Sequence, residues 1–225
     1  MTRISQSAIP GAPYLVQQEL RQQRPIFRSL EDYRRFLENL KLECRKVGVG
    51  ILAYCLTRDQ IQLVAVPEEE DALELCLDRL RNSFDSLWEV GFRCWLLDES
   101  RVIEALRFVE QSPLREGLTL NPGDYRWSSS AAHIHGRDDS QVLNMHYWLE
   151  SNSIRNWGAE LNKSIAELPE LTKQLPLRYA GRSGFRRGQE PRSGIRMVQS
   201  RASASAPGLP TLQPSTRLRH DVHPR

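Results

Sequence analysis

The chain has 225 residues, a formal net charge of +3 at pH 7, and a composition that is 40% hydrophobic and 26% charged. This length allows one sizeable core, while the sequence contains neither an N-terminal signal peptide nor an apolar run long enough for a transmembrane helix. Its four cysteines are 11, 21 and 18 residues apart, which favours buried thiols in a reducing compartment and predicts a cytoplasmic protein without a membrane partner.

The first predicted elements are a strand, a helix and a hairpin. Residues 13–20 alternate well enough for a strand, and Ser29 followed by Asp32 forms a weak capping box at the start of a helix. The apolar residues of this helix recur at helical spacing and are Tyr33, Phe36, Leu37, Leu40, Cys44 and Val47. Residues 49–56 and 60–66 are β-rich runs separated by a short polar turn, which predicts an antiparallel hairpin.

A helix, a strand and another helix follow. Residues 67–88 form an amphipathic pattern with acidic residues in the first turn, where the helix dipole favours them. Residues 91–97 are a strand candidate, and Asp98 or Ser100 caps a helix that ends before Pro113. This order predicts an α+β fold, a ferredoxin-like or RRM-like antiparallel sheet with helices on one face and a small C-terminal helical extension. The other face of the sheet is then expected to be free for a partner.

Composition divides the chain into three predicted parts: an α+β domain over residues 8–120, a helical extension over 121–174 and a basic tail over 175–225. The tail has ten arginines against two acidic residues, a net charge of +8, which leaves −5 for residues 1–174. The tail is rich in Arg, Ser, Pro and Gly, so we expect it to be disordered. Such a tail is typical of nucleic-acid contacts, and a solvated tail without a partner explains it equally well.

Two glutamines interrupt the second strand of the hairpin. Gln60 and Gln62 share one face with Val64 and Val66, because side chains alternate along a strand. Neighbouring buried amides cost free energy unless their donors and acceptors are paired. Their presence in a run that is otherwise suited to burial therefore needs an explanation.

Several segments, in order, resemble the REP-associated tyrosine transposases, a branch of the single-tyrosine HUH (insertion-sequence-type) transposases. The resemblance covers roughly residues 8–160 and is carried by IPGAPYLVQQELRQQRPIF, LEDYRRFLENLKLECRKVGVGILAYCL, IQLVAVP, LWEVGF, LLDES, LRFVEQSPLREGL and PGDYRWSS. It implies single-stranded DNA cleavage at structured repeats during DNA transposition. In such enzymes two histidines hold Mg²⁺ or Mn²⁺, and a tyrosine hydroxyl attacks the scissile phosphate.

The resemblance places the catalytic positions of the family on unsuitable residues. The two histidines fall on Gln60 and Gln62, and the tyrosine falls on Arg93. Neutral amides are weaker ligands than imidazoles, and a guanidinium cannot act as the nucleophile. The segment between Arg81 and Leu87 is also shorter than its counterpart in the family. We therefore expect a degenerate site without catalytic residues, metal or cofactor.

His133 and His135 form a second His-x-His pattern, but two histidines without a third ligand are usually ordinary polar residues. The predicted function is a catalytically inactive, transposase-like protein that binds single-stranded or hairpin repeat DNA as a monomer or homodimer. An active metal-dependent transposase with an altered site, and a folded relic that binds nothing specific, are the alternatives. The arginines predicted to contact DNA are Arg21, Arg24, Arg28, Arg34, Arg35, Arg182, Arg186 and Arg187.

Overall fold

The computed structural model describes residues 8–19, 25–83, 92–150, 156–164, 171 and 177–180 of the chain. The chain divides into two compact units, residues 1–189 and 190–225, and all described residues belong to the first unit. Within these described residues, no helix is both long and apolar enough to cross a membrane.

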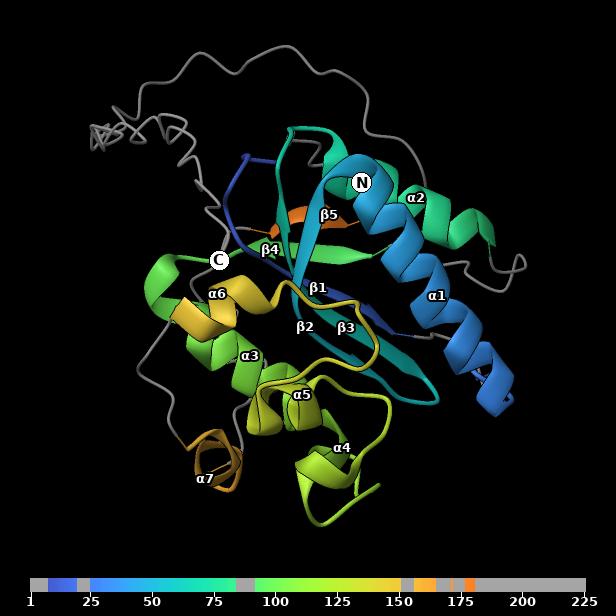
Figure 1. Ribbon diagram of the computed structural model, residues 1–225. Coiled ribbons are helices and arrows are strands. Elements are labelled where there is room, and N and C mark those ends of the chain that lie inside the picture. Colours follow the sequence, from blue (N-terminus) through green and yellow to red (C-terminus); the bar gives the residue numbers. More distant parts are fainter. Residues whose placement is uncertain are drawn as a thin grey trace, which may run out of the picture. The chain divides into compact units, whose positions relative to one another are not determined.

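An antiparallel sheet of five strands forms the centre of this unit, in the order β2-β3-β1-β4-β5 (Figure 1). The strands are β1 (Tyr14–Glu19), β2 (Val49–Leu56), β3 (Gln60–Pro67), β4 (Arg93–Leu96) and β5 (Leu177–Ala180). The order of the first four strands is that of a ferredoxin-like sheet. The α+β class and the antiparallel sheet predicted from the sequence are thus confirmed.

Two helices, α1 (Leu30–Val47) and α2 (Ala72–Ser83), cover one face of the sheet. The predicted capping box is present at α1, since Ser29 Oγ accepts from the Asp32 N–H and the Asp32 carboxylate accepts from the Ser29 N–H. The helix ends at Gly48, whose φ of 70° lies in the left-handed region that glycine adopts easily. Helix α2 begins five residues later than predicted, and the acidic residues 68–71 lie before its first turn and not within it.

The opposite face of the sheet is covered as well, which corrects the expectation of a free face. Helix α3 (Val102–Glu110) packs there with α6 (Met145–Glu150) and α7 (Trp157–Leu161). Sheet residues such as Leu15 and Val64 are fully buried against this layer. Both faces of the strands are apolar, so both need a covering layer to leave water. A short element, η1 (Glu99–Arg101), precedes α3, and three more lie between α3 and α6, namely α4 (Ser112–Arg115), η2 (Pro122–Asp124) and α5 (Ser130–His135).

Strand β5 lies within the segment that we expected to be disordered from residue 175. The expectation is wrong for Leu177–Ala180, which pairs with the edge strand β4. Backbone hydrogen bonds to an open sheet edge stabilise a strand even when its sequence offers little apolar surface. Residues 181–225 lie outside the described part of the chain.

Candidate functional site

Three polar residues form one row across the middle of the sheet. Gln17 on β1 lies opposite Gln62 on β3 and opposite Arg93 on β4. Directly opposed residues direct their side chains to the same face, and adjacent strands lie about 4.8 Å apart. The backbones of Gln62 and Arg93 are therefore separated by roughly 10 Å. The sheet thus brings together the positions singled out in the sequence, with Gln60 two residues before Gln62 on the same face.

The two glutamines of β3 bond to each other. Gln62 is 2% exposed, and its Nε2 donates to Oε1 of the half-buried Gln60 at 3.0 Å. The Oε1 atom of Gln62 is buried and accepts no hydrogen bond from any described residue. The Gln60 oxygen thus satisfies one donor of the Gln62 amide. The buried Gln62 oxygen has lost its hydrogen bonds to water without replacing them among the described residues, which costs free energy.

This pair does not fit a divalent metal ion. The amides are neutral, and the oxygen of Gln60 already accepts a hydrogen bond from Gln62. Hard cations such as Mg²⁺ favour several oxygen ligands with carboxylates among them. Among the described residues, no group of three His, Cys, Asp or Glu side chains could hold a metal. No chemical step through a metal can be assigned to these residues.

Arg93 is exposed at the first position of β4, with Gln17 on one side and Ala180 of β5 on the other. A guanidinium stays protonated, so this position offers a cation and no nucleophile. The predicted shortened segment between Arg81 and Leu87 lies largely outside the described residues, since 84–91 are not described.

Four of the described tyrosines, Tyr33, Tyr54, Tyr125 and Tyr147, have hydroxyl groups that are disfavoured as nucleophiles. Burial raises the pKa of Tyr54 to about 12, and it also raises the pKa of Tyr33, Tyr125 and Tyr147. The hydroxyl of Tyr125 donates to the Leu56 carbonyl at 3.0 Å. An activated nucleophile needs the opposite shift, toward easier loss of the proton. A relocated tyrosine nucleophile therefore has no support at these four positions.

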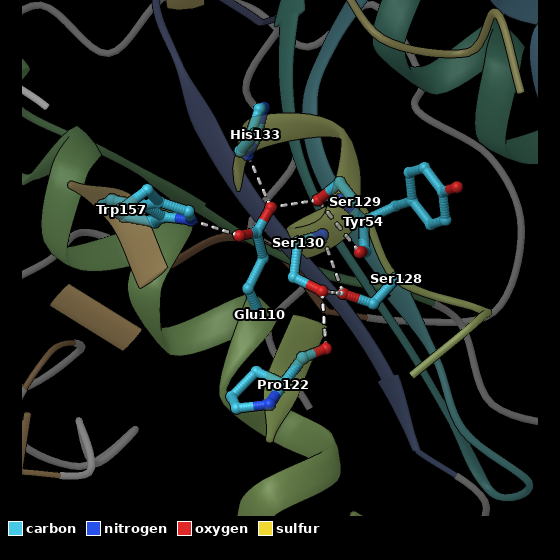
Figure 2. A network of polar contacts seen from close by, with 8 residues as sticks. All are labelled: Tyr54, Glu110, Pro122, Ser128, Ser129, Ser130, His133 and Trp157. Carbon is cyan, nitrogen blue, oxygen red and sulfur yellow. Dashed lines mark hydrogen bonds and ion pairs between the residues drawn. The ribbon is translucent and has the colours of Figure 1, made fainter. Parts of the chain in front are cut away.

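A buried carboxylate explains His133. Glu110 at the end of α3 is fully buried, and His133 Nδ1 lies 2.6 Å from its Oε1 (Figure 2). The Ser129 hydroxyl donates to the same oxygen, while Trp157 Nε1 donates to Oε2 at 2.6 Å. The ring of His133 also stacks on Trp148 at a centroid distance of 4.0 Å. These contacts join α3, α5 and α7 in one polar network.

This network makes His133 a packing residue. His133 and His135 both lie on α5, where residues two apart point to different sides of the helix. They therefore cannot bind one ion as two such residues on a strand could. Sequence reasoning missed Glu110 and Ser129, although both lie in motifs that carried the resemblance. The structure shows that these two motifs meet each other through this hydrogen bond.

The arginines predicted to contact DNA fall into two groups. Arg28 is exposed just before α1. On α1, Arg34 Nη1 lies 3.4 Å from Glu31 Oε2, and Arg35 Nη2 lies 4.0 Å from Asp32 Oδ1. The remaining predicted arginines lie outside the described residues, and these are Arg21, Arg24, Arg182, Arg186 and Arg187.

The comparisons with known proteins bear on the fold. No family model matches the chain, and no curated protein matches it. A solved structure of a REP-associated tyrosine transposase bound to a REP hairpin is similar, with a TM-score of 0.52 and 12% sequence identity. The two chains share a fold. The similarity covers 64% of this chain and 94% of the transposase chain, and at this identity it establishes the fold alone.

Proposed function

We propose that this chain is a transposase-like protein that binds single-stranded or hairpin DNA and does not cleave it. The observation that carries the proposal is the shared face of Gln60 and Gln62 on β3 and Arg93 on β4. The three positions that the family resemblance assigns to metal ligands and nucleophile converge on one face of the sheet. They are filled by Gln60, Gln62 and Arg93, which supply neither a metal site nor a nucleophile.

The DNA part of the proposal has its own support. The similar solved structure is of a transposase bound to a hairpin. The described part of the chain also presents exposed arginines that form no ion pair with another described residue, among them Arg28, Arg58 and Arg126. Clustered arginines bind the phosphate backbone through electrostatic attraction and release of counterions. The cytoplasmic location and the absence of a cofactor remain predictions.

A denaturing gel tests the proposal that the protein does not cleave DNA. The protein is incubated with labelled hairpin DNA and Mn²⁺, and the gel is searched for cut strands and for a covalent protein–DNA band. We expect neither, because loss of a nucleophile alone removes several orders of magnitude of rate. A covalent band that disappears after substitution of one native tyrosine would establish the active enzyme with an altered site.

A native binding assay tests the DNA part separately. The hairpin should bind more tightly than a duplex of equal length, with an affinity that falls steeply as salt rises. A protein that binds neither DNA at low salt would instead be a folded relic of the transposase fold.

A further inference from the structure

A pocket of about 700 Å³ lies beside the start of α1 and the β2–β3 turn. It is lined by two arginines and two aromatic rings together with smaller groups, namely Pro25, Phe27, Arg28, Ser29, Leu30, Tyr33 and Arg58. Its volume lies in the range of about 300–1,000 Å³ that is usual for ligand pockets. The sequence analysis assigned no role to Arg58, which lies in the hairpin turn two residues before Gln60.

The backbone holds both arginines in place. The carbonyl of Arg58 accepts the N–H groups of Ile26 and Phe27 at 2.9 and 3.3 Å, so the turn is attached to the segment that precedes α1. The N–H of Arg28 donates to the Asp32 carboxylate at 2.8 Å. The two cations thus approach the pocket from anchored backbone, which lowers the entropy lost when a ligand binds.

Two of the lining residues, Phe27 and Tyr33, belong to an aromatic stack. Phe27 stacks on Tyr33 with ring centroids 4.3 Å apart, and Tyr33 stacks on Trp127 at 4.7 Å. The guanidinium of Arg126 lies 5.1 Å from the centre of the Trp127 ring. Arg126 therefore lies at the Trp127 end of this stack, while Arg28 and Arg58 line the pocket together with Phe27 and Tyr33.

The charges of this pocket are available to an anion. Neither Arg28 nor Arg58 forms an ion pair with a residue that the structure describes. The carboxylate of Asp32 is already engaged by two backbone N–H groups. The first amides of α1 are partly used by the capping box, so the arginines and not the helix end provide the free donors.

We propose that Arg28 and Arg58 bind a backbone phosphate of the DNA, with Phe27 and Tyr33 as the apolar wall beside it. This inference rests on the proposed function, because DNA is taken as the source of the phosphate. Guanidinium groups suit this ligand, since their planar set of donors matches phosphate oxygens. The pocket also lies next to the turn that leads into Gln60, the first residue of β3.

The test compares the full chain with the double variant Arg28→Gln, Arg58→Gln in hairpin binding measured by fluorescence anisotropy. We expect about tenfold weaker binding, with a salt slope reduced by roughly 0.7 to 0.9 for each phosphate contact that is lost. The matched control is Arg45→Gln, because Arg45 is an exposed arginine in the last turn of α1, far along the helix that begins beside the pocket. It should change affinity less than about twofold. Asp59→Asn removes a carboxylate next to Arg58 and should strengthen binding.

The outcomes separate the pocket from the function. If the double variant binds DNA as well as the Arg45 control does, the pocket proposal is wrong and the proposed function stands. If the unmodified chain binds no DNA, the proposed function fails. The pocket is then tested by measuring whether inorganic phosphate raises the unfolding temperature in a thermal-shift assay. A shift that requires both arginines supports a phosphate pocket for a small ligand, and no shift in the unmodified chain overturns it.

Discussion

Gln62 Nε2 donates to Gln60 Oε1 at 3.0 Å, so the two amides that fill the expected metal positions are bonded to each other. A metal ion bound there would have to break this hydrogen bond, and in exchange it would gain only a neutral amide oxygen as a ligand. We therefore expect these two residues not to bind divalent cations tightly.

Titration of the protein with Mn²⁺ or Mg²⁺ in a calorimeter should show no one-to-one site tighter than about 0.1 mM. The physical reason is the lack of charge on both amides together with the missing third ligand among the described residues. A tighter site that is abolished by Gln60→Ala would contradict this prediction. A site that survives this substitution would lie elsewhere in the chain.

The start of α1 should give the protein a measurable acid dependence through Asp32. Burial raises the pKa of this carboxyl, but hydrogen bonds from the N–H groups of Arg28 and Ser29 outweigh it and hold the pKa below its ordinary value of 3.8. A lowered pKa stabilises the fold above pH 3.8, and this contribution is lost as the pH falls through the folded value.

Asp32→Asn should therefore lower the free energy of unfolding by about 1 kcal/mol at pH 7, which is typical of a lost helix cap. The difference from the unmodified chain should vanish at a pH well below 3.8, where both side chains are neutral. Urea unfolding at several pH values measures it. A difference that stays constant across this range would show that the charge of Asp32 contributes nothing.

The network around Glu110 should contribute strongly to stability. Glu110→Ala removes the acceptor shared by Ser129, His133 and Trp157; the Ser129 hydroxyl can still donate to the Tyr54 carbonyl, whereas the buried His133 and Trp157 lose their partner. We expect a loss of about 3–5 kcal/mol in the free energy of unfolding, as for other broken buried pairs. Chemical denaturation monitored by tryptophan fluorescence measures this loss.

Glu104→Ala is the matched control on the same helix. Glu104 is 38% exposed and lies 3.4 Å from Arg101, so its removal should cost less than about 1 kcal/mol. Equal losses for the two variants would mean that the buried carboxylate has no special role. In that case the network in Figure 2 would be only a consequence of packing.

The sequence predicts the core well where periodicity and capping agree. The stripe on α1 supplies Phe36, Leu40 and Cys44 to the core, and the predicted capping box is present at Ser29. The placement of Gln62 with Val64 on one face also follows from alternation along β3. These features depend on residues that are close in the chain.

Features that depend on distant residues could not be predicted in the same way. Glu110 meets Trp157 47 residues later, and no periodic pattern encodes such a contact. The second covered face of the sheet has the same origin, because it requires α3 and α7 to pack together over Leu15. The pocket at Arg58 likewise joins a hairpin turn to the segment before α1.

The basic segment after β5 should contribute to DNA affinity. A chain that ends at Ala180 keeps β5 paired with β4, but it loses nine arginines, from Arg182 to Arg225. Its hairpin binding should weaken, and the slope of log affinity against log salt should flatten by about 0.7 to 0.9 for each lost phosphate contact. Anisotropy titrations at several salt concentrations measure both quantities.

A second truncation, which ends at Gln189, identifies the arginines responsible. It keeps the first compact unit complete and retains the predicted contacts Arg182, Arg186 and Arg187. If these three residues bind the backbone, this chain should keep most of the affinity that the shorter one loses. If both truncated chains bind as tightly as the full protein, the segment is a solvated appendage. The contacts to DNA then belong to the folded part, where Arg28 and Arg58 are the candidates.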